Sequence, residues 1–225
     1  TYTMIISKIG AILQLKPSFP MPNQEIRQLV YDSRRASGSH DELFIALKGK
    51  NKDGHEFISA LYELGVGNFI VDENFDSANY VDANFLKVSN PLIALQRIAT
   101  EIRSEFNGEV IGITGSNAKT IVKEWLSTIL EHDRKVLKSP KSYNSQVGVP
   151  LSLWAMKDHH EMAIIEAGIS MPGEMEKLER MIRPTIGIMS NIGSAHQENF
   201  AKLSDKVKSK MGLFKRADYL IYCAD

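Results

Sequence analysis

The sequence predicts an α/β protein with a small mixed α/β domain followed by a parallel-sheet domain with a phosphate-binding loop. Three observations lead to this fold class. Short apolar runs alternate with amphipathic helical stretches. A helix-opening Asn-Pro step at 90–91 divides the chain into two segments. In the second segment, an apolar run leads directly into a small-residue loop and then a helix.

The bulk composition is that of an ordinary globular chain. Its 225 residues suffice for one large domain or two small ones, and 43% are hydrophobic and 24% charged. The 27 Lys and Arg residues balance 27 Asp and Glu residues, so the formal net charge is zero. Charge therefore gives no argument for a nucleic-acid or membrane-surface partner.

Cysteine usage and hydropathy point to the cytoplasm. Cys223 is the single cysteine, which suits a reducing compartment. No apolar run approaches the ~20 residues that a bilayer-spanning helix needs. The first fifteen residues carry a lysine inside their apolar stretch and lack a small-residue cleavage site, so they do not resemble a signal peptide.

The first segment, residues 1–89, is expected to form the small mixed α/β domain. Strands are predicted at Leu43–Leu47, Asn68–Asp72 and Phe85–Val88, and a helix at Gly54–Leu64, where apolar residues recur at helical spacing. Asn90 and Pro91 then open a helix whose apolar face continues to the break at Asn107-Gly108. This stretch, 90–107, is predicted to connect the two domains.

The second segment, residues 108–225, alternates strands and helices regularly, which favours a parallel sheet covered on both faces. The predicted strands are Val110–Thr114, Lys135–Leu137, Met162–Glu166, Thr185–Asn191 and Tyr219–Cys223. The predicted helices are Lys119–Glu131, Val147–Met156, Glu174–Met181 and Leu203–Phe214. In the first helix, the side chains expected to face inward are Val122, Trp125, Leu126 and Ile129. Ligands of such sheets bind beyond the carboxyl ends of the strands.

The segment TGSNAKT has the order that a phosphate-binding loop requires. Backbone N–H groups of small residues close around phosphates, and the helix N-terminus adds positive potential. The expected cofactor-binding residues are Thr114, Gly115, Ser116, Asn117, Ala118, Lys119 and Thr120. Lys119 would reach the terminal phosphates, and the Thr120 hydroxyl would bind Mg²⁺. The alternative is an ordinary strand-to-helix turn with Ser116 or Asn117 as its N-cap.

The loop departs from a full Walker A motif, because its spacing is shorter and Ala118 precedes the lysine where that motif has glycine. If this position needs a positive φ, a Cβ costs roughly 1–2 kcal/mol and crowds the phosphates. If φ is negative, the substitution is mild. The sequence leaves both possibilities open.

A carboxylate and a histidine follow neighbouring predicted strands. Glu166 ends one strand, and His196 lies in the loop after the next. Beside a phosphate loop, the two suggest a second Mg²⁺ site, which favours phosphoryl transfer. The alternatives are an exposed strand-end acid and a solvated loop histidine. Lys210, on the following helix, would be assigned to solvent from its spacing alone.

These motifs, in this order, resemble the Mur ligase family over nearly the whole chain. The loop is similar to the family's TGSNGKT, and Ile164–Leu178 and Ser190–Phe200 resemble the segments with the metal-binding glutamate and histidine. Lys208–Phe214 resembles the helix whose lysine is carbamylated, which implies a carbamate on Lys210 as a further metal ligand. The resemblance thus implies Thr120, Glu166, His196 and Lys210 as metal ligands, and Lys119, His196 and Lys210 as catalytic residues.

The N-terminal motifs are most similar to the branch of the family that adds D-alanyl-D-alanine. Tyr31–Ala36 and Leu43–Ile58 resemble its UDP-binding domain, and Ser139–Trp154 resembles the segment that meets the muramoyl peptide. The substrate-binding residues that this implies are Ser33, Arg34, Asp53, Gly54, His55 and Asn144. The versions fused to an alanine racemase are also similar, although no racemase lysine segment is present.

The resemblance implies an ATP-dependent ligase that joins UDP-N-acetylmuramoyl-tripeptide to D-alanyl-D-alanine through an acyl phosphate. It also implies a third domain that is absent here, so the chain alone is expected to be inactive. The alternative is a module that only binds the UDP-sugar and nucleotide. A GTPase is disfavoured, because no NKxD-type base-reading motif follows the loop.

Overall fold

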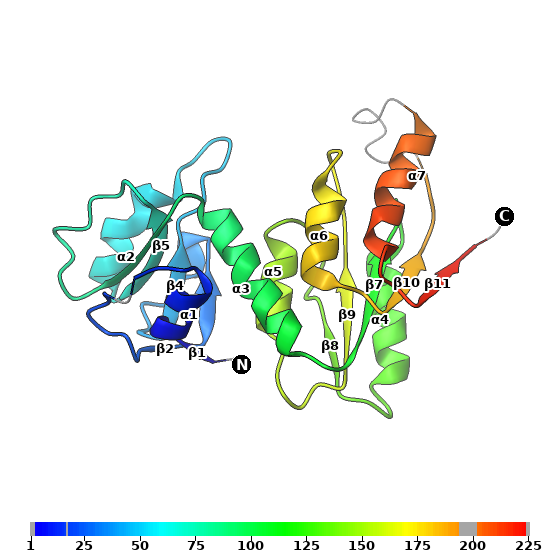
Figure 1. The fold of residues 1–225 in the computed structure, drawn as a ribbon, viewed down its shortest axis with the longest axis horizontal. Helices are drawn as coiled ribbons and strands as arrows, with labels where there is room; N and C mark the ends of the chain where they lie inside the picture. The colour runs from blue at the N-terminus through cyan, green and yellow to red at the C-terminus, as the bar shows by residue number, and fades with distance from the viewer. Residues whose placement is uncertain (1–2, 17, 194–201, 224–225) are drawn as a thin grey trace. The chain divides into compact units, whose positions relative to one another are not determined.

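Two units make up the chain, Thr1–Ile98 and Ala99–Asp225 (Figure 1). The structure is a computed structural model that describes residues 3–16, 18–193 and 202–223. Each unit holds its own parallel sheet, and the predicted α/β class with parallel sheets is confirmed. Helix α3 (Pro91–Glu105) crosses the division between the units.

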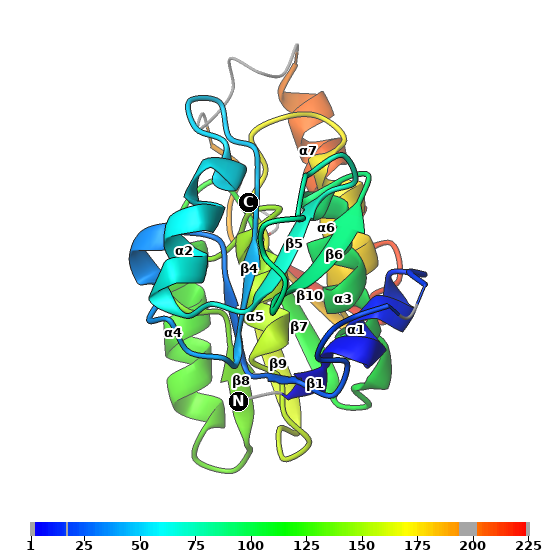
Figure 2. The same cartoon turned by 90° about the vertical axis from the view of Figure 1, so that its left-hand side faces the viewer.

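The sheet of the first unit has the strand order β3-β4-β5-β6, and all its strands are parallel. Its strands are β3 (Gln28–Val30), β4 (Glu42–Ile45), β5 (Asn68–Asp72) and β6 (Asn84–Val88). Helix α2 (Ile58–Leu64) lies beside it (Figure 2) and buries Ile58 and Leu61 against Phe44 and Phe69. A short antiparallel pair, β1 (Met4–Ile5) with β2 (Glu25–Ile26), and α1 (Ile6–Ile12) complete the unit.

The helix expected at Gly54–Leu64 begins differently from the prediction. Its first turn is a 3-10 turn, η2 (Gly54–Phe57), and α2 follows. The side chain of Asp53 caps this turn by accepting a hydrogen bond from the His55 backbone N–H at 3.0 Å. Such a cap favours a tight turn over a regular first helical turn.

The sheet of the second unit has the order β11-β10-β7-β9-β8, again parallel throughout. Its strands are β7 (Glu109–Thr114), β8 (Val136–Lys138), β9 (Met162–Glu166), β10 (Ile186–Met189) and β11 (Tyr219–Tyr222). Its helices are α4 (Lys119–Leu130), α5 (Gly148–Trp154), α6 (Glu174–Ile182) and α7 (Leu203–Met211). No helix in the described part of the chain is long and apolar enough to span a membrane.

Different elements cover the two faces of this sheet. Helix α4 packs on Ile111 and Ile113 of the central strand. The side chains of successive strand residues point to opposite faces, so Gly112 opens onto the other face. There, a Cβ added at Gly112 would come within 2.8 Å of Pro184 and 3.5 Å of Leu213, which belongs to the 3-10 turn η4 (Gly212–Phe214).

Two of the four side chains expected to face inward from α4 do not. Val122 and Leu126 pack on the sheet, but Trp125 is 71% exposed and Ile129 is 66% exposed. A helix resting on one sheet face buries a single stripe, here the i, i+4 row that starts at Val122. Trp125 and Ile129 belong to the neighbouring row and point away from it.

Candidate functional site

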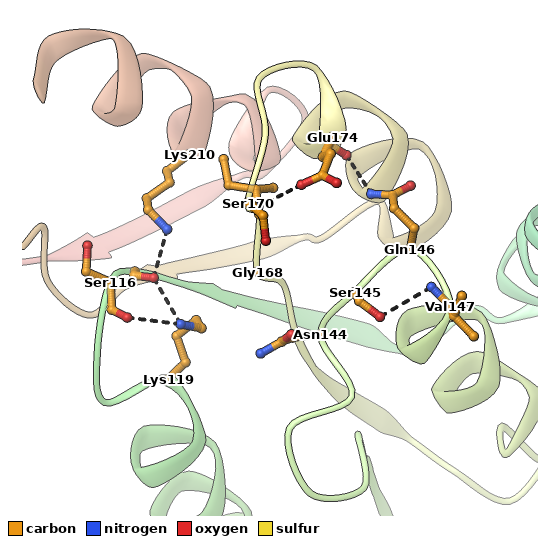
Figure 3. A pocket seen from close by; sticks show the side chains of 12 residues that line it. Ser116, Lys119, Asn144, Ser145, Gln146, Val147, Gly168, Ser170, Glu174 and Lys210 are labelled. Atoms are coloured by element: carbon orange, nitrogen blue, oxygen red, sulfur yellow. Dashed lines mark hydrogen bonds between the residues drawn. The ribbon is translucent and has the colours of Figure 1, made fainter. Parts of the chain in front are cut away.

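A pocket of about 260 Å³ lies where the strands of the second unit end (Figure 3). It is lined by Gly115, Ser116 and Lys119 of the loop, by 144–147, by 168–170 with Glu174, and by Lys210. The strands β7 and β9 end directly before two of these segments. The pocket therefore sits at the carboxyl ends of a parallel sheet, where ligands of this architecture bind.

The loop between β7 and α4 is held by the segment that follows β10. The backbone N–H of Ser116 donates to the Asn191 carbonyl at 2.8 Å, and the N–H of Asn117 donates to the Asn191 side-chain oxygen at 2.8 Å. In return, the Ser190 hydroxyl donates to the Asn117 carbonyl at 2.6 Å. Two segments far apart in sequence thus fix the loop's shape, and Asn191 was not among the predicted site residues.

The alternative of an ordinary turn with Ser116 or Asn117 as the N-cap of α4 is wrong. The N-cap position of α4 is Ala118, and no side chain caps the helix there. Neither Ser116 nor Asn117 satisfies the first N–H groups of α4, which leaves the positive end of the helix open to an anion.

Ala118 adopts a left-handed conformation, with φ 62° and ψ 0°. This decides the question that the sequence left open. The Cβ at this position is strained by roughly 1–2 kcal/mol, because the left-handed region brings it close to the backbone.

Replacing Ala118 with glycine is therefore expected to stabilise the chain by up to about 1 kcal/mol. The relieved strain exceeds the entropy that glycine adds to the unfolded chain, roughly 0.4–1 kcal/mol. Urea denaturation of both proteins measures the change. A matched control is Ala155→Gly, where φ is −76° and no strain exists to relieve. If both glycine variants lose stability equally, the left-handed conformation carries no cost.

Two lysine ammonium groups converge on one backbone carbonyl of the loop (Figure 3). The carbonyl of Gly115 accepts from Lys119 Nζ at 3.1 Å and from Lys210 Nζ at 2.8 Å. Lys210 is only 4% exposed, so the assignment to solvent from helix spacing is wrong. Its i−4 neighbour Lys206 is also buried and donates to the Gly193 carbonyl. One face of α7 thus turns inward toward the loop.

Burial lowers the pKa of both lysines that contact the Gly115 carbonyl. Burial lowers the pKa of Lys210 to about 8, and the charges of Lys119 and Lys206 add to the effect. Burial also lowers the pKa of Lys119, although the charge of Glu166 partly offsets it. Several cations close to one loop create a positive potential that attracts an anion such as phosphate.

The stability of the chain is expected to rise with pH between about 8 and 10.5 because of Lys210. Its pKa is depressed in the fold from 10.5 to about 8, so the unfolded chain binds more protons across that window. Lys210→Met lacks the effect. The difference in unfolding free energy between wild type and variant should therefore increase with pH, by at most about 1.4 kcal/mol per unit. A difference that does not change from pH 7 to 10 would contradict the lowered pKa.

Glu166 is a buried carboxylate whose oxygens accept from neutral donors. It is 1% exposed, and its Oε2 accepts from the Thr120 hydroxyl at 2.8 Å. Its Oε1 accepts from the Asn144 amide at 2.6 Å. The salt bridges of the described residues include none to Glu166. The alternative of an exposed strand-end acid is therefore wrong, and a buried charge of this kind fits a cation beside it.

The predicted metal ligands are only partly brought together. Thr120 and Glu166 are in direct contact, whereas the Lys210 ammonium donates to the Gly115 carbonyl. His196 lies outside the described residues. Within the described ranges, no group of three His, Cys, Asp or Glu side chains is placed to hold a metal. Mg²⁺ commonly takes one or two protein oxygens and completes its shell with water and phosphate, so Thr120 with Glu166 fits that ion.

Asn144 has a partner that the sequence did not suggest. It was expected to meet a peptide substrate, and it lines the pocket, but its amide nitrogen donates to Glu166. Its backbone carbonyl accepts from the Gly168 N–H at 2.8 Å, beside the end of β9. The side chain therefore also orients the carboxylate.

In the first unit, Ser33 and Arg34 lie in a 3-10 turn (η1, Ser33–Arg35) after β3. Arg34 pairs with Asp32 through two contacts, Nε to Oδ1 at 2.8 Å and Nη2 to Oδ2 at 2.7 Å. The hydrogen bond from Arg34 holds the pKa of Asp32 at about 2. The Arg34 side chain is 87% exposed, so the guanidinium remains accessible.

The loop of Asp53, Gly54 and His55 is fixed from within. His55 Nε2 accepts from the Asp72 backbone N–H at 3.0 Å, so the ring proton is on Nδ1, which contacts Asp53 Oδ1 at 2.5 Å. A Cβ at Gly54 would lie 2.8 Å from the Leu47 nitrogen, so only glycine fits there. Both ring nitrogens are engaged, and His55 shapes the loop.

Comparison with known proteins gives a consistent set of similarities. The model of the Mur ligase middle domain matches residues 113–225, and that of the Mur ligase family catalytic domain matches residues 25–131. UDP-N-acetylmuramoyl-tripeptide–D-alanyl-D-alanine ligase from Bacillus subtilis (strain 168) is 33% identical over 187 residues, covering 82% of this chain and 41% of the relative. The ligase of the same name from Rickettsia prowazekii (strain Madrid E) is 37% identical over 174 residues, covering 77% and 38%.

Solved structures agree with the sequence comparison. MurF from Acinetobacter baumannii superimposes with a TM-score of 0.89 at 25% identity, covering 99% of this chain and 49% of that one. MurF ligase from Thermotoga maritima, in complex with ADP, superimposes with a TM-score of 0.78 at 29% identity, covering 88% and 46%. The chain thus spans less than half the length of the relatives that it matches.

Proposed function

Because the chain belongs to the Mur ligase family, we propose that it is the part of an ATP-dependent ligase that binds nucleotide and a UDP-linked muramoyl peptide. In this proposal, the enzyme joins UDP-N-acetylmuramoyl-tripeptide to D-alanyl-D-alanine. These are the two substrates in the names of the relatives from Bacillus subtilis and Rickettsia prowazekii. The observation that carries the proposal is the loop with Lys119 at its end, next to the buried carboxylate of Glu166.

The proposed reaction has two steps, phosphorylation of the peptide carboxylate and attack by the amine. A carboxylate oxygen of the peptide attacks the γ-phosphorus of ATP, which forms an acyl phosphate and releases ADP. The amine nitrogen of D-alanyl-D-alanine then attacks the acyl carbon; the C–N bond forms, phosphate leaves and the amine loses a proton. Lys119 holds the terminal phosphates, and the first backbone N–H groups of α4 orient them.

Thr120 and Glu166 are proposed to hold Mg²⁺, with His196 and a modified Lys210 as further ligands. Bound there, the ion would supply positive charge that neutralises charge developing on the transferred phosphoryl group. Asn144 keeps the Glu166 carboxylate in place. The oxygen-rich, buried surroundings of Glu166 support this assignment.

A carbamate on Lys210 is a further part of the proposal. Only a neutral amine reacts with CO₂; its nitrogen forms the new C–N bond and one proton is released. A pKa of about 8 gives Lys210 a larger neutral fraction near neutral pH than an ordinary lysine has. The two neighbouring lysine charges then favour the negative carbamate.

The first unit is proposed to bind the UDP moiety through Ser33, Arg34 and the Asp53–His55 loop. In this proposal the functional divisions of the chain are 1–89, 90–107 and 108–225. The second candidate is a module that only binds the sugar nucleotide. That function does not explain why the Thr120 hydroxyl and the buried Glu166 carboxylate lie together beside the phosphate loop.

Arg34→Ala is expected to weaken binding of UDP-muramoyl peptide about tenfold or more. The exposed guanidinium can leave Asp32 and pair with a phosphate through two hydrogen bonds. Calorimetry on wild type and variant measures the change, with Arg27→Ala, an exposed arginine paired with Glu25, as the control. Equal weakening by both variants, or no ligand-dependent chemical shifts in residues 30–60, would contradict this site.

The nucleotide part of the proposal is tested on the 225-residue chain. Mg·ATP or Mg·ADP should raise its thermal midpoint, because a ligand that binds only the folded state stabilises it. Ligation is tested on the product of the complete gene, by mass spectrometry of the pentapeptide product. No shift with either nucleotide at millimolar concentration would overturn the proposal.

A further inference from the structure

Lys123 is the most deeply buried charged side chain on α4. It is 0% exposed, one turn beyond Thr120, on the helix that begins at the phosphate loop. Its ammonium donates to the carbonyl of Ser139 at 2.7 Å and to the carbonyl of Lys141. Glu124 Oε1, at 3.2 Å, gives it an ionic partner. Burying a charge is costly unless it is paired and hydrogen-bonded, and here all three ammonium hydrogens have partners.

The two carbonyls belong to the segment that leads from β8 to Asn144. Lys141 in this segment has a φ of 50°, in the left-handed region that side chains other than glycine rarely adopt. The ammonium of Lys123 therefore holds a strained turn in place. The turn continues through Tyr143, whose N–H donates to the Pro140 carbonyl at 3.1 Å, directly before Asn144.

Both ends of this segment contact Glu166, one at its backbone N–H and the other at its carboxylate. The Ser139 hydroxyl accepts from the Glu166 backbone N–H at 3.2 Å, and the Asn144 amide donates to Glu166 Oε1 at 2.6 Å. The remaining oxygen of Glu166 accepts from Thr120. Ser139, Asn144 and Thr120 thus hold Glu166 in place. Lys123 does not contact the Glu166 carboxylate, but it binds the backbone carbonyls of the segment that carries Ser139 and Asn144.

We propose that Lys123 is a positioning residue that sets the orientation of Glu166 and Asn144 for Mg²⁺. The inference rests on the proposed function and adds a residue to it. Side chains that orient a metal ligand typically change metal affinity 10–100-fold when they are replaced. Lys123 contacts the segment that holds Glu166 and not Glu166 itself. Replacing Lys123 is therefore expected to reduce metal affinity by a factor at the lower end of that range.

The test compares ADP affinity in Mg²⁺ with ADP affinity in EDTA, by calorimetry on the full chain. In Lys123→Met, the Mg²⁺-dependent gain in affinity is expected to fall about tenfold, while the affinity in EDTA stays within about twofold. The matched control is Lys138→Met, because Lys138 pairs with the same Glu124 at 2.8 Å but contacts neither carbonyl. That control should keep the full Mg²⁺-dependent gain. A purely structural role would instead lower both affinities equally.

A second variant keeps the test decisive if Lys123→Met does not fold. Ser139→Ala removes the buried hydroxyl that accepts from Glu166, and it should also reduce the Mg²⁺-dependent gain. Retention of the wild-type gain by Lys123→Met, or by Ser139→Ala where the first variant does not fold, overturns the inference. A wild type that binds ADP without any Mg²⁺-dependent gain overturns the inference and leaves nucleotide binding standing. A wild type that binds no ADP overturns the proposed function itself.

Discussion

Replacing Lys119 with methionine is expected to lower the affinity of the chain for Mg·ATP at least about a hundredfold. Its ammonium now donates to the Gly115 and Ser116 carbonyls at 3.1 and 3.3 Å, and it is partly desolvated. A phosphate would offer it charge-assisted hydrogen bonds worth roughly 1.5–3 kcal/mol each. Two such bonds correspond to about 3–6 kcal/mol, or a factor of at least a hundred.

Calorimetric titration with Mg·ATP measures the loss. The control is Lys177→Met, which removes a lysine from the exposed face of α6 and leaves the loop untouched. The fold of Lys119→Met should be intact, because methionine fills a similar volume without a buried charge. An affinity within threefold of the wild type would mean that Lys119 does not contact the nucleotide.

Glu166→Gln is expected to abolish the Mg²⁺-dependent part of nucleotide affinity and to leave the free chain at least as stable as the wild type. The glutamine oxygen can accept from Asn144, and its amide can donate to the Thr120 hydroxyl, so the hydrogen bonds made at 2.6 and 2.8 Å survive in a neutral form. The buried charge disappears, and with it the cost of keeping a carboxylate away from water.

The two readouts are ADP affinity with and without Mg²⁺, and the urea midpoint of the free chain. Glu109→Gln serves as the control, because Glu109 is exposed at the opposite end of the same sheet, where β7 begins. A large drop in the stability of Glu166→Gln would show that the carboxylate is a structural element of the free fold. An unchanged effect of Mg²⁺ would place the ion elsewhere.

The sequence alone determined the order of the elements and the position of the loop. Alternating apolar runs and helical stretches are local patterns, and the strands at β5 and β9 lie where they were predicted. The strand β3 was not predicted, because its three residues give too short an apolar pattern to detect. The family resemblance added Lys210, which spacing alone would have left in solvent.

Only the tertiary structure decided how the site is assembled. The contacts that shape it join residues far apart in the chain: Thr120 to Glu166 across 46 residues, Asn117 to Asn191 across 74, and Lys210 to Gly115 across 95. A local pattern contains no information on such partners. Whether a side chain on a helix or at a strand end is buried depends on what packs against it, and this is why Glu166, Lys123 and Lys210 were found inside the protein and Trp125 outside it.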